Sequence, residues 1–171
     1  MRRIARFHKV SEEQFIEGWE ASFGKGLKKE KIQEIYEAIK LPKRATAGSA
    51  GYDFFAPASI VLAPGQTAKI PTGIRVEMEP DWVLKCYPRS GLGFKYRLQL
   101  NNTVGIIDSD YFYSDNEGHI FAKITNDTNE GKTVEIPDGT GFMQGIFVEY
   151  GITVDDDVKE VRNGGFGSTS R

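Results

Sequence analysis

The segment from Gly105 to Tyr111 combines an apolar run with acidic and aromatic side chains. Asp108 directly follows Ile106 and Ile107, so we expect its carboxylate at the edge of a core. A carboxylate held there can orient a water molecule and accept a proton from it. On local evidence alone, the structural alternative, an aspartate that caps a turn, is favoured. The segment is therefore a candidate for general base catalysis, weighed against a structural role.

The segment Pro88-Arg89-Ser90-Gly91-Leu92-Gly93 places an arginine, a hydroxyl group and two glycines within one predicted turn. A guanidinium, a hydroxyl and unhindered backbone amides can together hold phosphate oxygens. A glycine turn with a surface arginine is the structural alternative. The sequence contains no Walker-type glycine and lysine pattern, so this segment is not a P-loop.

The C-terminal residues, from Arg162 to Thr169, are rich in glycine and poor in packing side chains. On composition alone, this segment is a disordered terminus. However, Phe166 lies between glycines, and an aromatic ring can stack on a nucleobase. The guanidinium of Arg162 and the hydroxyls after Phe166 can hold phosphates. The tail is therefore also a candidate for a flexible lid over a nucleotide, covering residues 160–171.

Two helices are predicted before residue 42. Ser11-Glu12-Glu13-Gln14 is a capping box, in which the Ser11 hydroxyl and the Gln14 side chain each satisfy a free amide. The second helix, residues 28–40, carries an apolar stripe at helical spacing, formed by Ile32, Ile35, Tyr36 and Ile39. The stripe indicates either a helical pair packed on its own chain or a surface for a protein partner. Its burial decides between the two.

The rest of the chain reads as β structure. Short apolar or alternating runs, separated by glycine and proline, are typical of a β-sandwich or barrel. We expect strands near residues 4–10, 60–62, 67–78, 82–87, 98–101, 119–125, 132–136 and 142–150. The chain is therefore expected to be mainly β, with an N-terminal helical insertion at about residues 11–40.

Length and composition exclude several classes of protein. A chain of 171 residues is expected to form one domain, residues 1–171, and its net charge of −2 argues against binding to duplex nucleic acid. No apolar run is long enough to span a membrane, and the N-terminus lacks the apolar core of a signal peptide. One cysteine cannot form an internal disulfide, so we expect a cytoplasmic protein. Glycine is the outlier, with 19 residues, and suggests backbone brought close to a ligand.

Taken together, the segments are far more specific than any one of them. Residues 50–53, 88–93, 105–111, 139–147 and 162–169 occur in an order that resembles the homotrimeric dUTPases. The resemblance covers residues 42–171, and the helices at 11–40 lie outside it. It implies a jelly-roll-like β-barrel, a homotrimer with shared active sites, and hydrolysis of dUTP to dUMP and pyrophosphate. That reaction keeps uracil out of DNA and supplies dUMP for thymidylate synthesis.

The resemblance also implies roles for individual residues. Asp108 would be the catalytic base that activates the water attacking the α-phosphate, and Asp53 would support the site. Residues expected to bind the uracil and the deoxyribose are Asn102, Gly105, Ile107, Tyr111 and Phe166. Residues expected to bind the phosphates are Arg89, Ser90, Gly91, Gln144, Arg162, Gly167, Ser168 and Thr169. The cofactor is Mg²⁺, held by substrate phosphates and water and by no protein side chain directly.

The sequence departs from the family pattern at three places. Gly141 stands where an arginine is usual, and Arg162 lies one residue nearer Phe166 than in many members. Residues 112–118 lengthen the turn after Tyr111, and this loop is expected at the rim of the site or against a neighbouring chain. Two alternative functions stay open: a dCTP deaminase of the same fold, and a nucleotide-dependent regulatory protein that binds a partner through the helical insertion.

Overall fold

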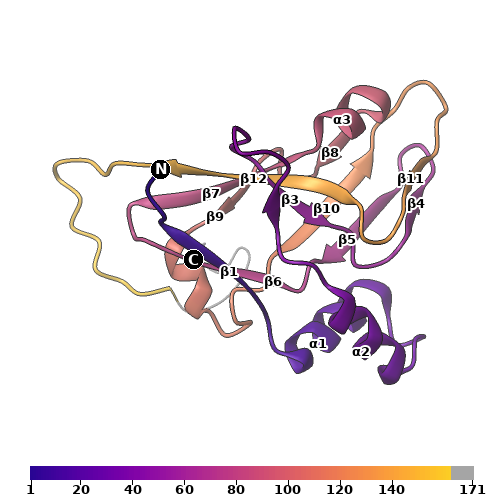
Figure 1. Cartoon of the computed structure of the whole chain (residues 1–171), viewed down its shortest axis with the longest axis horizontal. Coiled ribbons are helices and arrows are strands. Elements are labelled where there is room, and N and C mark those ends of the chain that lie inside the picture. Colours follow the sequence, from indigo (N-terminus) through magenta and orange to yellow (C-terminus); the bar gives the residue numbers. More distant parts are fainter. Residues whose placement is uncertain (163–171) are drawn as a thin grey trace.

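The computed structural model describes residues 1–162, and its body is a set of short antiparallel strands wrapped around one apolar core (Figure 1). The strands are β1 (Ala5–Lys9), β2 (Lys43–Arg44), β3 (Tyr52–Phe55), β4 (Ile60–Leu62), β5 (Thr67–Pro71), β6 (Ile74–Met78), β7 (Trp82–Pro88), β8 (Leu98–Leu100), β9 (Gly105–Ile107), β10 (Phe121–Asn126), β11 (Val134–Ile136) and β12 (Gly141–Glu149). The helices are α1 (Glu12–Phe23), α2 (Lys29–Ala38), α3 (Ser90–Tyr96) and the 3-10 helix η1 (Ser109–Tyr113). The expected mainly β fold is therefore confirmed.

The strands pair in four groups. The largest sheet has the order β2-β3-β12-β7-β9, and a second has the order β5-β10-β8. Two further pairs, β1 with β6 and β11 with β4, complete the body. Buried side chains from most of these strands meet in one cluster, which includes Phe54, Ile70, Leu84, Ile124 and Phe142. Apolar residues alternate along the short strands because one face of each strand is turned to this core.

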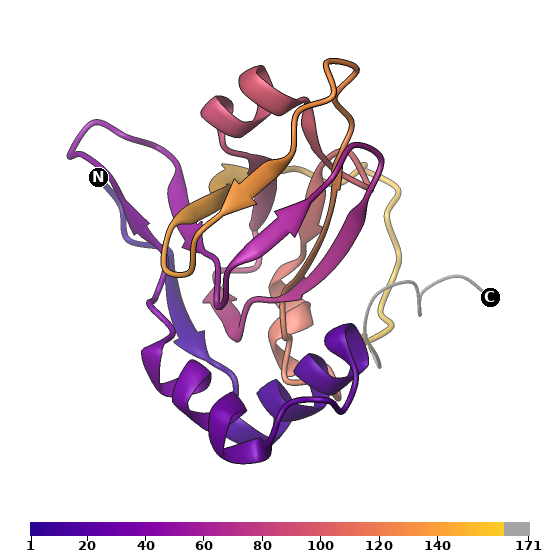
Figure 2. The ribbon, with the colours of Figure 1, turned by 90° about the vertical axis from the view of Figure 1, so that its right-hand side faces the viewer.

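The two predicted helices of the insertion are present, and they lie together at one end of the strand body (Figure 2). They share a second apolar cluster, in which Phe15 and Ile32 are fully buried. The remaining members of the predicted stripe on α2 pack against this cluster as well. The apolar stripe is thus covered by the protein's own chain, which removes the main argument for a partner surface there.

The region around the phosphate-binding candidates differs from the sequence prediction. Residues 90–96 form the helix α3 where a glycine turn was expected, and α3 lies at the opposite end of the body from α1 and α2 (Figure 2). The helix ends at Arg97, whose φ of 51° is left-handed and whose amide donates to the Gly93 carbonyl. The short strands β2, β3 and β9 and the helix η1 also had no clear signal of their own, since each is only two to five residues long.

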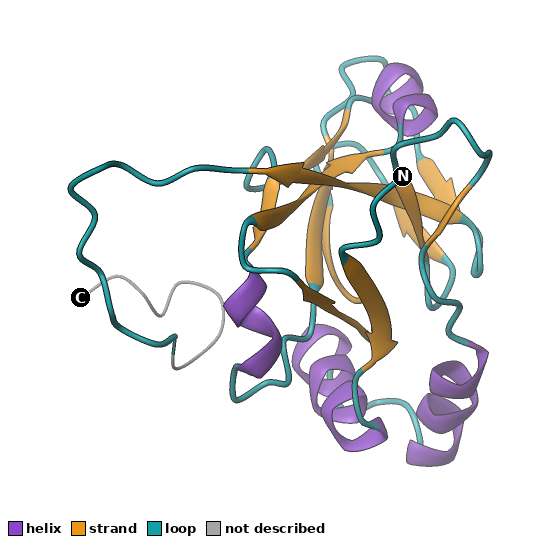
Figure 3. Cartoon of the chain, turned by 60° about the vertical axis from the view of Figure 1, so that its left-hand side comes forward, coloured by secondary structure: helices purple, strands orange, loops and turns teal. Residues whose placement is uncertain are grey.

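After β12 the chain leaves the body as an exposed loop and then returns toward η1 (Figure 3). This path ends, among the described residues, at Arg162. Within residues 1–162, no helix is both long and apolar enough to cross a membrane.

Candidate functional site

Asp108 follows β9 directly and is paired with an arginine from the other end of the chain. The Arg162 Nη2 atom lies 2.5 Å from the Asp108 Oδ2 atom, and Arg162 Nε donates to Asp110 Oδ1 at 2.9 Å. The Asp108 side chain is about half exposed, at 47%, whereas Arg162 is 16% exposed. The predicted catalytic carboxylate and one predicted phosphate ligand therefore meet in one cluster, with Asp110 as a third member that the sequence analysis did not identify.

Tyr111 is held beneath this cluster by hydrogen bonds on both sides of its hydroxyl group. The hydroxyl donates to the His119 carbonyl at 2.7 Å and accepts from Asn116 Nδ2 at 2.8 Å. Burial raises the pKa of the Tyr111 hydroxyl, against the opposing effects of the Asn116 hydrogen bond and the Arg162 charge. The Arg162 guanidinium lies 5.9 Å from the centre of the Tyr111 ring. The ring is thus fixed in place next to Asp108.

The predicted base-reading residues line one small cavity. Asn102, Gly105 and Ile107 are part of its wall, and Cys86 from β7 forms part of its floor. At Gly105 an added Cβ would lie 3.1 Å from the Cys86 Cβ, so glycine allows the close approach of β9 to β7. Burial raises the pKa of the Cys86 thiol to about 12, so the thiol stays neutral. Most of the other residues that line this small cavity are apolar, among them Leu100, Ile120 and Met143.

A second polar cluster surrounds Arg89. Its Nε atom lies 3.3 Å from the Asp53 Oδ1 atom, which agrees with the supporting role expected for Asp53. Gln144 lies next to them on β12, with its Nε2 atom 3.5 Å from the Pro88 carbonyl. A Cβ added at Gly141 would lie 3.0 Å from the Arg89 Nη1 atom. Glycine at this position therefore leaves room for the Arg89 side chain.

Ser90 and Gly91 begin α3 beside this cluster and are exposed. Their place at the start of the helix leaves backbone amides free of helical partners, as phosphate binding requires. The predicted ligands Phe166, Gly167, Ser168 and Thr169 lie outside the described residues, as does most of the proposed lid.

The two clusters lie at opposite ends of β7. Ile107 pairs with Leu84 across the ladder, so Asp108 follows at the level of Val83. Arg89 is six residues beyond Val83, which corresponds to roughly 20 Å along an extended strand. A single triphosphate chain is much shorter than this separation. The described residues of one chain therefore do not bring Asp108 and Arg89 to the same phosphates.

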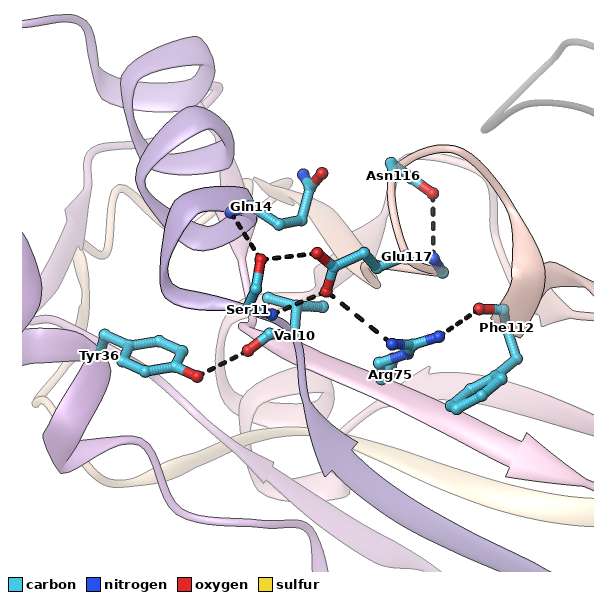
Figure 4. Close-up of polar contacts among 9 residues, drawn as sticks. Val10, Ser11, Gln14, Tyr36, Arg75, Phe112, Asn116 and Glu117 are labelled. Carbon is cyan, nitrogen blue, oxygen red and sulfur yellow. Dashed lines mark hydrogen bonds and ion pairs between the residues drawn. The ribbon is translucent and has the colours of Figure 1, made fainter.

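Two functional candidates, one in the lengthened loop and one directly after it, escaped the sequence analysis because their contacts are with distant segments. Glu117 accepts from the Ser11 amide at 2.7 Å and from the Ser11 hydroxyl at 2.6 Å (Figure 4). The Ser11 hydroxyl caps α1 as predicted, but Glu117 takes the place expected for the Gln14 side chain at the Ser11 amide. Partial burial raises the pKa of the Glu117 carboxyl, yet the bonds from Ser11 and the charge of Arg75 outweigh it and lower the pKa overall.

His119 is the second such residue and is fully buried between the loop and α1. Its Nε2 atom accepts from the Gly73 amide at 2.9 Å, whereas its Nδ1 atom has no hydrogen-bond partner in the described structure. Burial lowers the pKa of His119 to about 4. An added Cβ at Gly18 would lie 2.7 Å from the His119 ring, so α1 and this ring are in close contact.

The protein is a mainly β barrel with arginine and carboxylate clusters at its strand ends. Comparison with known proteins shows the family to which it belongs. The dUTPase family model matches residues 37–170. The chain belongs to the dUTPase family. Residues before 37, which include β1, α1 and most of α2, lie outside the matched range.

Individual relatives agree with this assignment. Deoxyuridine 5'-triphosphate nucleotidohydrolase from Lactococcus lactis is 43% identical over 134 residues, which cover 77% of this chain and 88% of the relative. The corresponding protein from Tolumonas auensis is 39% identical over 143 residues, covering 80% and 91%. The crystal structure of dUTPase from Streptococcus mutans matches with a TM-score of 0.59 and 38% identity, covering 66% of this chain and 88% of that one.

Proposed function

We propose that this protein hydrolyses dUTP to dUMP and pyrophosphate. The observation that carries the proposal is the grouping of Asp108, the fixed Tyr111 ring and the backbone hairpin at residues 102–105 on one short stretch of chain. These groups would supply a catalytic base, a ring under the sugar and a backbone hairpin that reads the nucleobase. The names of relatives up to 43% identical support the same reaction.

In the proposed reaction, Asp108 orients a water molecule and accepts one of its protons. The water oxygen forms a bond to the α-phosphorus, and the bond from that phosphorus to the bridging oxygen of pyrophosphate breaks. Because pyrophosphate leaves readily once its charge is neutralised, the protein mainly positions the groups and stabilises charge. Asp108 is half exposed and is therefore open to a water molecule from solvent.

Base selection would follow from the backbone hairpin at residues 102–105. Uracil presents one N–H donor between two carbonyl acceptors, which a backbone hairpin can match from Asn102 to Gly105. A cytosine would leave polar groups unpaired, and that mismatch is costly in a buried site. Because β9 lies close against Cys86, β9 has little room to shift for a bulkier base. Tyr111 would pack under the deoxyribose and exclude a ribose 2′-hydroxyl.

The phosphates would be held by Arg89, Ser90, Gly91 and Gln144, together with Arg162. Mg²⁺ would neutralise the phosphate charge and draw electrons from the leaving group. Within residues 1–162, no group of three or more His, Cys, Asp or Glu side chains could hold a metal ion. We expect the donors to Mg²⁺ to be phosphate oxygens and water, which this ion prefers. The structure of a dUTPase from phage phi11, 25% identical to this chain, is described as coordinating a structural Mg(II) ion.

We also propose that the working enzyme is a homotrimer with shared active sites. The argument is the separation of roughly 20 Å between Asp108 and Arg89 along β7. A second chain that supplies its Arg89 cluster next to Asp108 would complete the site. Residues 160–171 would then close over the nucleotide as a lid, and Arg162 would move from Asp108 to the phosphates when substrate binds.

Hydrolysis of dUTP, dCTP, dTTP and UTP, with and without Mg²⁺, tests the proposed function. We expect pyrophosphate release from dUTP, dependent on Mg²⁺, and little from the other three. Release of ammonia from dCTP would instead identify a deaminase, and no reaction with dUTP would refute the proposal. Light scattering should give three times the chain mass of 19.1 kDa. A monomer would contradict the shared sites.

A further inference from the structure

We propose that Glu117 is a positioning residue for Tyr111, and that the helical insertion braces the turn under the sugar through the first residues of α1. The inference rests on the proposed function, in which the Tyr111 ring lies under the deoxyribose. It gives the insertion, which lies largely outside the matched family region, a part in substrate selection. The supporting contacts run from α1 through the lengthened loop to the Tyr111 hydroxyl.

Residues in and directly after the lengthened loop hold the Tyr111 hydroxyl by two hydrogen bonds. Asn116 donates to the Tyr111 hydroxyl at 2.8 Å, and the same hydroxyl donates to the His119 carbonyl at 2.7 Å. Gly118 has a φ of 70°, and an added Cβ there would lie 2.6 Å from the Tyr111 carbonyl oxygen. Residues 116–119 therefore close tightly on Tyr111, and a shift of these residues moves its ring.

A second set of contacts joins this loop to α1. Glu117 lies between Asn116 and Gly118 and accepts both the amide and the hydroxyl hydrogen of Ser11 (Figure 4). Bonds to a carboxylate are among the stronger hydrogen bonds in proteins. The Glu117 backbone has a φ of 58°, a left-handed conformation that non-glycine residues seldom adopt. The loop accepts this conformation and thereby directs the carboxylate toward Ser11.

Arg75 on β6 provides a second anchor on the same carboxylate. Its Nη1 atom lies 3.8 Å from Glu117 Oε2, and its Nη2 atom donates to the Phe112 carbonyl at 2.6 Å. Its guanidinium also lies 3.7 Å from the centre of the Phe112 ring (Figure 4). Arg75 thus contacts both ends of the loop, and Glu117 lies between the strand body and the helical insertion.

In a third set of contacts, α1 packs on the far side of the loop. The His119 ring lies against Phe15 and directly opposite Gly18. The carbonyl of the same His119 receives the Tyr111 hydroxyl. The insertion therefore reaches Tyr111 by two routes, through Glu117 and through His119. Without these contacts, the lengthened loop at residues 112–118 would leave the Tyr111 ring less firmly placed, and a ribose 2′-hydroxyl would be less firmly excluded.

The test compares the selectivity for dUTP over UTP, expressed as the ratio of their kcat/KM values. We expect Ser11→Ala and Glu117→Gln each to lower this ratio by roughly tenfold, as for the loss of one charge-assisted hydrogen bond. Ser11→Thr keeps the hydroxyl and should keep the ratio. Glu12→Gln is the matched control, because Glu12 contacts Gln33 within the insertion and is one residue from Ser11. It should also keep the ratio.

A purely structural role for Glu117 would lower the melting temperature and leave the ratio unchanged. An unchanged ratio in both Ser11→Ala and Glu117→Gln would therefore overturn the proposal. If these variants do not fold, hydrogen exchange of the wild-type protein with and without dUMP tests the proposal instead. We expect dUMP to slow exchange in residues 112–118 and at the Ser11 amide, whereas protection of the loop alone would overturn the proposal. A wild-type protein that does not hydrolyse dUTP refutes the proposed function instead.

Discussion

The buried His119 predicts a specific dependence of stability on pH. Its pKa in the folded protein is lowered to about 4 by burial, and the ordinary value of a histidine is 6.5. The unfolded chain therefore binds a proton near pH 6.5 that the folded protein does not accept until about pH 4. The contribution of the neutral His119 to the free energy of unfolding is fully present above pH 6.5 and is lost as the pH decreases from 6.5 to about 4.

The size of the effect follows from the two pKa values. Between pH 7 and pH 5, linkage gives a loss of about 2 kcal/mol in the free energy of unfolding, and the loss approaches about 3 kcal/mol near pH 4. The unpartnered Nδ1 atom and the close contact with α1 explain why the charged ring is not accommodated. Nearby Glu117 favours the charged form, whereas Lys69 opposes it.

The assay is urea unfolding at pH 7, 6 and 5, at one fixed chain concentration, followed by tryptophan fluorescence. The test variant is His119→Gln, because glutamine can still accept from the Gly73 amide but does not titrate. We expect its stability to change by about 2 kcal/mol less than that of the wild type between pH 7 and pH 5. His8→Gln, which removes the chain's other histidine, is the matched control. A His119→Gln slope equal to that of the wild type would refute the reasoning.

Three further predictions concern the site and the insertion. Asp108→Asn should keep dUTP binding but lower turnover at least about a hundredfold in a steady-state assay, and near-normal turnover would remove Asp108 from the role of base. Gly141→Ala places a methyl group 3.0 Å from the Arg89 guanidinium, so we expect KM for dUTP to rise by roughly tenfold with kcat and the melting temperature nearly unchanged. An unaltered KM would contradict this prediction and show that Arg89 can shift away from the added methyl group without loss of substrate affinity. Phe15→Ala empties the fully buried centre of the helical cluster and should lower stability in urea by about 3–5 kcal/mol. A loss below about 1 kcal/mol would show that the insertion unfolds independently of the barrel.

Local patterns were enough to predict many of the elements. The helical stripe from Ile32 to Ile39 and the Ser11 cap predicted the two helices, because the signals that favour a helix lie within a few neighbouring turns of the same segment. Alternation along residues 82–87 predicted β7 for a similar reason. The helix α3 was missed because Gly91 and Gly93 weaken the helical signal, and contacts of Leu92 and Tyr96 with the core compensate for them.

The sequence by itself determined the family and predicted many of the candidate site residues, because these lie in short segments whose residues and order can be recognised in a single chain. The tertiary structure decided what surrounds them. Nothing near Glu117 in the sequence indicates Ser11, which lies 106 residues away, and the predicted site placed Arg162 on the phosphates and did not predict its ion pair with Asp108. The burial of His119 likewise depends on α1 packing over it. These contacts join distant segments, and their strength comes from burial and geometry that exist only once the chain has folded.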